Sequence, residues 1–297
     1  MSTTDVRAER GLVPALVLST RPRQWAKNLL VLAAPLAAGS LTEPQVAWET
    51  LVAVISFLMA SCAVYLLNDC LDVDADRQHP SKRNRPIAAG EVPVPLALTV
   101  AGVLAAGSLA VAALTGVPLL VLMVTYLLLQ VAYAQWLKHQ PVLDIAVVAS
   151  GFLLRAVAGG LASELPISQW FLLVAGFGSL FIVSGKRYSE LRMLGAEAGT
   201  RRSLTMYTEG YLRFMWGVCT SVTIMSYSLW AFREPGASEV QWHALSIAPF
   251  VLGMLRYAVV IDAGRAGEPE DIIWRDRGLQ MLGVLWLVLL LIGVAHD

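Results

Sequence analysis

The sequence predicts an all-α membrane protein in which nine helices cross the bilayer, and three observations lead to this fold class. Hydrophobic residues make up 57% of the 297 residues and only 15% are charged, whereas soluble domains average about 25% charged residues. Mean hydropathy is accordingly high, at +0.62. The apolar residues form runs of the length that crosses a bilayer core, about 20 residues. The basic residues gather in alternate connections between these runs.

The apolar runs follow one another as a single membrane domain over residues 1–297, with a cytoplasmic tail over 1–20. We expect spans near 25–43, 46–67, 93–114, 117–136, 142–162, 168–185, 211–231, 243–262 and 279–295. A tight turn at Gly116-Val117-Pro118 separates the third span from the fourth. Because the first run begins late and further spans follow it, we expect it to stay as an anchor and not to be removed as a signal peptide. No repeat or soluble domain interrupts the series.

The distribution of Lys and Arg predicts the orientation of the chain in the membrane. All but two of the 22 basic residues lie towards one side; the exceptions are Arg155, inside a span, and Arg233, in an opposite connection. By the positive-inside rule the basic side is cytoplasmic. With an odd number of spans the two termini lie on opposite sides, so the N-terminus is expected inside and the C-terminus outside. The long connections also lie on this side, so we expect the chemistry to face the cytoplasm.

An acidic stretch ends the second expected span. Asn68, Asp72 and Asp76 follow one another at i, i+4 and i+8, so on a helix they share one stripe, with Asp69 beside it and Tyr65 one turn before. Stacked carboxylates at a helix C-terminus repel one another and oppose the helix dipole, so a cation must compensate them. A few carboxylate and amide oxygens suit Mg²⁺, which takes its other ligands from water and substrate phosphates. The alternative is a solvated acidic loop.

A basic group follows the acidic stretch within about ten residues. It comprises Lys82, Arg83 and Arg85, placed where a magnesium-bound phosphate would need cations. Loops on the cytoplasmic side are ordinarily basic, so the acids before this group are unusual there. Acid followed by base in this order indicates a metal together with a polyphosphate.

The pattern Asn68-Asp69-x-x-Asp72-x-x-x-Asp76, followed by Lys82-Arg83-Asn84-Arg85-Pro86, resembles the first signature of the UbiA superfamily of intramembrane prenyltransferases. The resemblance covers essentially the whole chain. It implies a UbiA-like bundle with a polar cap at the cytoplasmic face of the bacterial inner membrane and a lateral opening to lipid. Typical members bind a prenyl diphosphate through two aspartate-rich motifs and two magnesium ions, then transfer the prenyl group to an aromatic acceptor.

The chain departs from the superfamily pattern at the second motif. Where typical members have D-x-x-x-D, it has Lys186-Arg187-Tyr188-Ser189-Glu190, so Glu190 is the one acid that survives. A site with this Lys-Arg pair favours a second anion over a second metal. With the segments 21–28, 137–140, 153–160 and 266–271, this departure resembles a branch of the superfamily with reversed roles. Its diphosphate belongs to phosphoribosyl pyrophosphate (PRPP), and its acceptor is decaprenyl phosphate.

That branch makes a phosphoribosylated lipid, the precursor of the arabinose donor for cell-wall arabinan, and the resemblance implies a role for each candidate residue. Asp72, Asp69 and Asp76 are expected to be catalytic, with Asn68, Asp72 and Asp76 holding Mg²⁺. Substrate contacts are expected from Lys27, Tyr65, Lys82, Arg83, Arg85, Lys138, Arg155, Lys186, Arg187 and Glu190. The expected partners are PRPP, decaprenyl phosphate and the lipid bilayer, and no nucleic acid. A monomer and a homo-oligomer are both left open.

Several of these cations have a second interpretation. Arg155 lies inside a span, where an arginine faces a cavity or a partner, so it contacts a substrate phosphate or forms an ion pair with Asp144 or Glu164. Lys138 and Lys27 are either phosphate contacts or topology signals. Lys186 and its neighbour are alternatively cations that reach from a span end to the interface. For the whole chain, the alternatives are prenyl transfer to an aromatic acceptor and transport of an anionic solute. Transport would predict an internal repeat, which the sequence lacks.

Overall fold

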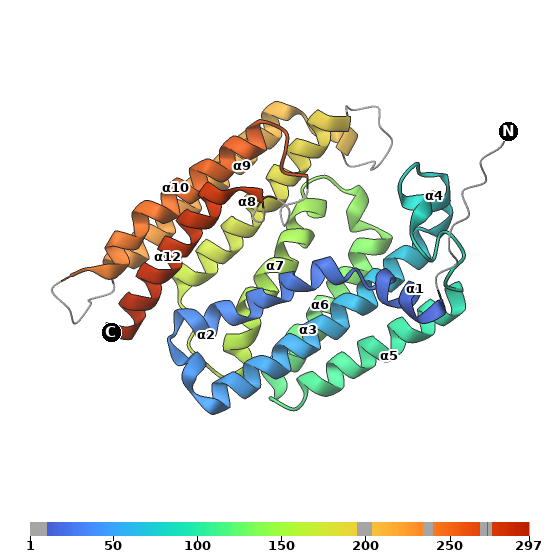
Figure 1. The fold of residues 1–297 in the computed structure, drawn as a ribbon, viewed down its shortest axis with the longest axis horizontal. Coiled ribbons are helices and arrows are strands. Elements are labelled where there is room, and N and C mark those ends of the chain that lie inside the picture. Colours follow the sequence, from blue (N-terminus) through green and yellow to red (C-terminus); the bar gives the residue numbers. More distant parts are fainter. Residues whose placement is uncertain (1–10, 195–203, 234–239, 268–271, 273–274, 297) are drawn as a thin grey trace. The chain divides into compact units, whose positions relative to one another are not determined.

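The computed structural model describes residues 11–194, 204–233, 240–267, 272 and 275–296. Helices are the regular structure of this part of the chain, which confirms the predicted all-α class (Figure 1). The long helices are α3 (Pro44–Leu71), α5 (Val94–Ala112), α6 (Val117–Gln135), α7 (Leu143–Ala162), α8 (Gln169–Leu194), α9 (Glu209–Arg233), α10 (Trp242–Asp262) and α12 (Arg277–His296). The short helices are α1 (Leu12–Ser19), η1 (Pro22–Leu32), α2 (Ala33–Ala37), η2 (Ser40–Thr42), α4 (Val73–Gln78), η3 (Lys82–Asn84), η4 (Leu137–His139) and η5 (Leu204–Met206).

Among the described residues, seven helices are long and apolar enough to cross a membrane: α3, α5, α6, α7, α8, α10 and α12. The expectation of nine spans is therefore not confirmed, and the two missing ones have different causes. The segment 25–43 is helical only in pieces, because the 3-10 helix η1 gives way to α2 after Leu32 and α2 ends before Gly39, whose φ is +69°. The segment 211–231 does form α9, but Thr and Ser residues along this helix lower its hydropathy.

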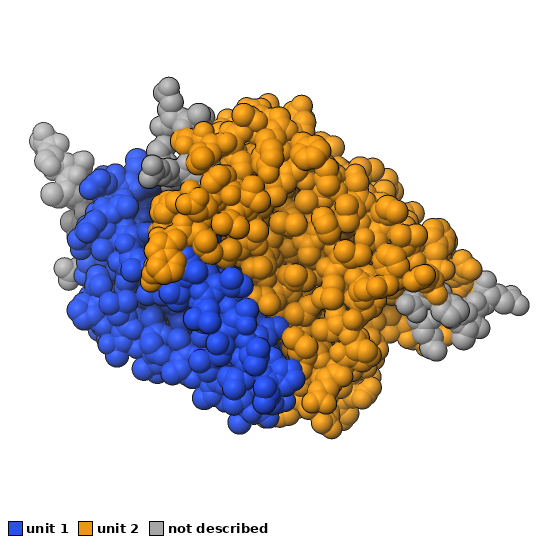
Figure 2. Space-filling view, turned by 180° about the vertical axis from the view of Figure 1, so that it is seen from behind, with its two compact units in different colours: residues 1–29, 51–134 blue, residues 30–50, 135–297 orange. Residues whose placement is uncertain are grey.

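The chain divides into two compact units (Figure 2). Unit 1 comprises residues 1–29 and 51–134, and unit 2 comprises residues 30–50 and 135–297. In unit 1, α1, α3 and α5 share an apolar core that includes Ala15, Leu66 and Ala97. Phe57 of α3 meets Tyr126 of α6 edge to face, with ring centroids 5.1 Å apart. Unit 1 carries the acidic stretch and the basic loop that follows it.

In unit 2, α8 packs against α7 and α9, and α10 packs against α12 and α9. A core cluster lies between these helices and includes Ile145, Phe181 and Leu212. The short helix α2 packs against α7, where Gly159 lets the backbone carbonyl of Val31 approach closely. Small residues at such contacts are how membrane helices pack tightly without a hydrophobic driving force. Unit 2 carries Lys138, Arg155 and the residues of the second motif.

Candidate active site

The acidic stretch of unit 1 spans the end of α3 and the start of α4. The two helices are separate because Asp72, between them, has φ −96° and ψ 8°. The i to i−4 hydrogen bonds nevertheless continue, since Asp72 N donates to Asn68 O over 2.9 Å and Asp76 N donates to Asp72 O over 2.8 Å. The predicted helical spacing of Asn68, Asp72 and Asp76 is thus present, with a bend at its centre. Asn68 and Asp72 are half-buried, whereas Asp69 and Asp76 are buried.

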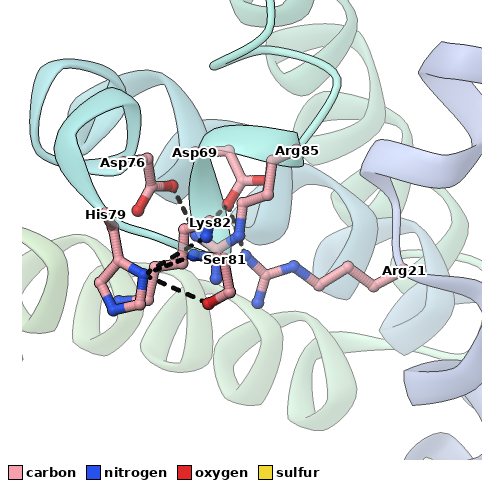
Figure 3. A network of polar contacts seen from close by, with 7 residues as sticks. All are labelled: Arg21, Asp69, Asp76, His79, Ser81, Lys82 and Arg85. Atoms are coloured by element: carbon pink, nitrogen blue, oxygen red, sulfur yellow. Dashed lines mark hydrogen bonds and ion pairs between the residues drawn. The ribbon is translucent and has the colours of Figure 1, made fainter. Parts of the chain in front are cut away.

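The two buried acids of this stretch are paired with arginines (Figure 3). Arg85 Nη1 donates to Asp76 Oδ2 over 2.6 Å and to Asp69 Oδ1 over 3.1 Å. Arg21 forms a second ion pair with Asp69. A buried carboxylate is tolerated only when it is paired and hydrogen-bonded, and these guanidinium groups meet that need. Arg85, predicted as a substrate contact, therefore bridges the two acids.

Arg21 joins the N-terminal segment to α3 within unit 1. Its guanidinium carbon lies 5.0 Å from the ring centroid of Tyr65, a cation–π contact. Its φ is +56°, which is uncommon for a residue with a side chain. Lys27 follows in η1 and is half-buried, and its neighbour Asn28 accepts a hydrogen bond from Ser61 Oγ over 3.1 Å. Arg21 was not among the predicted site residues. The segment 21–28, which begins with Arg21, nevertheless contributed to the resemblance on which those residues were chosen.

His79 organises the start of the basic loop (Figure 3). Its Nδ1 accepts hydrogen bonds from the backbone N–H groups of Ser81, over 3.2 Å, and Lys82, over 3.3 Å. Pro80 cannot continue α4, and the accepted bonds hold the chain in the turn that leads into η3. Lys82 is half-buried and Arg83 is exposed. Sequence reasoning missed His79. The signal that could have found it is the following Pro80-Ser81, because a proline and a serine next to the end of a helix favour a turn.

The second motif of unit 2 is paired with an acid of another helix, which sequence analysis weighed only as a partner of Arg155. Asp144, in the first turn of α7, accepts a hydrogen bond from Arg187 Nε over 3.2 Å. Arg187 also donates from Nη1 to Glu190 Oε2 over 2.7 Å. Arg187 of α8 is thus an ion partner of Asp144, a pairing that sequence analysis did not consider. Arg155 is buried and donates from Nη1 to the carbonyl of Gly151 over 2.7 Å.

The segment before α9 joins this group through Tyr207. Its hydroxyl donates to Asp144 Oδ1 over 2.6 Å and accepts from the backbone N–H of Val142 over 2.5 Å. Val142 has a φ of +68°, an outlier for a β-branched residue. Burial raises the pKa of the Tyr207 phenol, and the hydrogen bond to Asp144 raises it further. Lys186 and Lys138 are both half-buried in unit 2.

The oxygen donors of unit 1 are compatible with Mg²⁺ if water and a phosphorylated substrate supply the remaining ligands. No group of three or more His, Cys, Asp or Glu side chains among the described residues is arranged to hold a metal ion. Asp69 and Asp76 face arginines, and Asn68 and Asp72 are half-buried. Mg²⁺ characteristically binds through one or two carboxylates plus substrate phosphates. The donor set therefore fits a magnesium ion that is shared with a phosphorylated substrate.

Comparisons with known proteins show the family of the chain. The UbiA prenyltransferase family matches residues 29–274. The decaprenyl-phosphate phosphoribosyltransferase of Mycolicibacterium smegmatis is 49% identical over 291 residues, covering 94% of this chain and 92% of that protein. Its Mycobacterium tuberculosis counterpart is 51% identical over 282 residues, covering 93% of each. A UbiA homologue of Archaeoglobus fulgidus, solved with GPP and Mg²⁺, has the same fold, with a TM-score of 0.72 at 18% identity over 95% of this chain and 98% of that one. The chain belongs to the UbiA prenyltransferase family.

Proposed function

We propose that this membrane enzyme transfers the 5-phosphoribosyl group of PRPP to decaprenyl phosphate and releases pyrophosphate. The observation that carries the proposal is the identity of about one half, over more than nine-tenths of the chain, to two decaprenyl-phosphate phosphoribosyltransferases. The second motif supports it independently. Lys186 stands where prenyl-transferring members of the family have the first acid of the second motif, and a cation at that position suits a donor that carries a further phosphate.

The reaction joins two phosphorylated substrates, so its main requirement is to hold and neutralise phosphates. The bond from the ribose C1 to the pyrophosphate oxygen breaks, and a bond from C1 to an oxygen of the lipid phosphate forms. Positive charge develops on the ribose as in glycoside chemistry. The lipid phosphate is already ionised near pH 7, so no strong general base is required. Most of the acceleration then comes from positioning and electrostatic stabilisation.

In unit 1, Asn68 and Asp72 are the residues best suited to hold Mg²⁺, with Asp76 beside them. The bound ion would act as a Lewis acid for the leaving pyrophosphate. Arg85 keeps the two buried acids of the motif, Asp69 and Asp76, in place. Nearby cations of the same unit then contact phosphate oxygens, since lysine and arginine make charge-assisted hydrogen bonds to them. The cations in this role are Lys27, Lys82 and Arg83, with Tyr65 packed beneath Arg21.

In unit 2, Lys186 is the cation that we assign to the additional phosphate of the donor. It is half-buried near the end of α8, and Glu190 follows one turn later on the same face. Lys138 and Arg155 are further candidates for phosphate contacts in this unit. We also infer that the N-terminus and the site face the cytoplasm of a bacterial plasma membrane, because the basic residues gather on that side. This placement suits a donor from the cytosol and an acceptor from the bilayer.

The decisive experiment incubates the purified protein with labelled PRPP, decaprenyl phosphate and Mg²⁺. The expected result is phosphoribosylated lipid and pyrophosphate in equal amounts. Consumption of a prenyl diphosphate with an aromatic acid, and no use of PRPP, would establish the alternative family activity. Lys186→Asp should raise the KM for PRPP, whereas Arg77→Gln should leave it unchanged. Arg77 is a suitable control because it is exposed and paired with the exposed Asp74.

A further inference from the structure

Among the described residues of unit 2, Asp144 is the most deeply buried acid, and two other segments of that unit bind it. Its side chain has no exposed surface, and it lies in the first turn of α7. Oδ2 accepts from Arg187 of α8 over 3.2 Å, and Oδ1 accepts from the hydroxyl of Tyr207 over 2.6 Å. Both carboxylate oxygens are thus used by side chains that are 43 and 63 residues away in the sequence. A buried charge with this degree of pairing fixes its partners in one arrangement.

Arg187 is held by acids on two sides. Besides Asp144, its guanidinium bonds Glu190 Oε2 over 2.7 Å, and only 3% of its side chain is exposed. A guanidinium in this position is poorly placed to receive a substrate phosphate, because its exposed surface is small and its charge is already compensated. Arg187 therefore connects α7 to the end of α8.

Tyr207 completes the connection from the segment that precedes α9. Its hydroxyl is a donor to Asp144 and an acceptor for the backbone N–H of Val142. Val142 keeps a φ of +68°, and a β-branched residue holds such a conformation only where the surroundings determine it. The bond from Val142 to Tyr207 is one such determinant, and it defines where α7 begins. Three segments thus meet at one carboxylate.

The burial pattern along α8 shows which side chains the network around Asp144 supports. Arg187, Tyr188 and Ser189 are buried, whereas Lys186 and Glu190 are half-buried. Residues four apart lie on the same face of a helix, so Lys186 and Glu190 form the accessible charged face at this end of α8. The bond from Arg187 to Glu190 ties that face to the buried network.

We propose that Asp144, Arg187 and Tyr207 are positioning residues, which fix Lys186 and Glu190 for the phosphate-bearing donor without touching it. The inference rests on the proposed function, because it takes Lys186 to be a donor contact. It revises the expectation that Arg187 binds substrate directly. It also gives a role to Asp144, which sequence analysis considered only as a possible ion partner of Arg155.

The test compares Asp144→Asn, Tyr207→Phe and the double variant Asp144→Asn/Arg187→Gln with Asp262→Asn. Asp262 is the matched control, because it is a half-exposed acid of the same unit, paired with Arg213 at 2.9 Å. Loss of a hydrogen bond to a charged group should raise the KM for PRPP by about tenfold or more, with a smaller change in kcat. Asp262→Asn should keep the wild-type KM.

The double variant separates positioning from a merely structural role. It keeps hydrogen-bonding groups but removes both buried charges, so its thermal stability should recover relative to Asp144→Asn. If positioning is the role, the KM for PRPP stays raised despite this recovery. A KM that recovers together with stability, or unchanged KM values in Asp144→Asn and Tyr207→Phe, would overturn the proposal.

Two further measurements cover the cases in which a variant does not fold or the wild type does not use PRPP. If Asp144→Asn does not fold, Tyr207→Phe, which loses a single hydroxyl, carries the same comparison. If the wild type does not use PRPP, the proposed function fails, and inorganic pyrophosphate then becomes the probe. Pyrophosphate should stabilise the wild-type protein and the Asp262→Asn variant against heat more than Tyr207→Phe. Equal stabilisation of all three would reject the positioning network by itself.

Discussion

Arg85 Nη1 lies 2.6 Å from Asp76 Oδ2, and the same nitrogen lies 3.1 Å from Asp69 Oδ1. One cation of the basic loop thus bridges two buried acids of the aspartate-rich motif, and Arg21 adds a second cation at Asp69 (Figure 3). The acids of this motif consequently fall into two groups. Asp69 and Asp76 are buried against arginines, whereas Asp72 is half-buried and Asp74 is exposed.

This division predicts unequal effects on stability for two substitutions in the same stretch. Asp69→Asn removes the charge that faces both Arg21 and Arg85. Their side chains are 32% and 29% exposed, so the loss of stability should be smaller than the cost of breaking a fully buried ion pair, about 3–5 kcal/mol. Asp74→Asn is the matched control, because Asp74 is 86% exposed in its pair with Arg77, and such surface pairs contribute about 0–1 kcal/mol. Thermal unfolding in detergent should show a large loss of Tm for the first variant only. Equal Tm values would contradict a structural role for Asp69.

The magnesium requirement gives a second prediction. A chelator should abolish transfer, and added Mg²⁺ should restore it. Asp72→Asn should raise the Mg²⁺ concentration for half-maximal rate by at least about tenfold, since even groups behind a metal ligand change affinity by that factor. Asp74→Asn should leave that concentration unchanged, which is measured by titrating Mg²⁺ at saturating PRPP. A normal Mg²⁺ requirement in Asp72→Asn would remove this residue from the metal site.

The local pattern of the acidic stretch could be predicted from sequence, whereas its pairing could not. The spacing of Asn68, Asp72 and Asp76 follows from helical periodicity, and the structure keeps it. The ion pair from Arg21 to Asp69 joins residues 48 positions apart and depends on the turn in which Arg21 adopts a positive φ. Periodicity carries no information on contacts at such separations, so the cations of the basic loop were assigned to phosphates alone.

The same limit applies to the pairing of Asp144 and to the first expected span. Asp144 was considered beside Arg155 because both lie on one helix, whereas its partner Arg187 comes from α8. Over 25–43, hydropathy measures composition but not continuity, so the apolar run concealed the change of helix type after Leu32 and the break at Gly39. In contrast, the apolar runs that became α3, α5 and α6 were long and uninterrupted by proline in their interiors, and sequence located them well.

The contact between α2 and α7 predicts a steric effect at Gly159. A Cβ atom there would meet the carbonyl oxygen of Val31 and lie 2.9 Å from two ring carbons of Pro35. Overpacking of this kind costs about 1–3 kcal/mol, so Gly159→Ala should lower Tm. At Gly253 of α10, a Cβ atom would meet nothing within 4 Å among the described residues, and alanine favours a helix over glycine by about 1 kcal/mol. Gly253→Ala should therefore keep or raise Tm, and an equal fall in both variants would argue against the close packing of α2.

The raised pKa of Tyr207 predicts how the group around Asp144 responds to alkali. Burial and the bond to Asp144 favour the neutral phenol, so the folded-state pKa lies above the usual value of about 10. The stabilisation that Tyr207 contributes is therefore fully present below about pH 10 and is lost only as the pH rises through the higher folded-state value. Ultraviolet difference titration should show the same number of ionising tyrosines in wild type and Tyr207→Phe up to the pH at which the wild type unfolds. One additional phenolate in the wild type near pH 10 would mean that Tyr207 is solvated and does not hold Asp144.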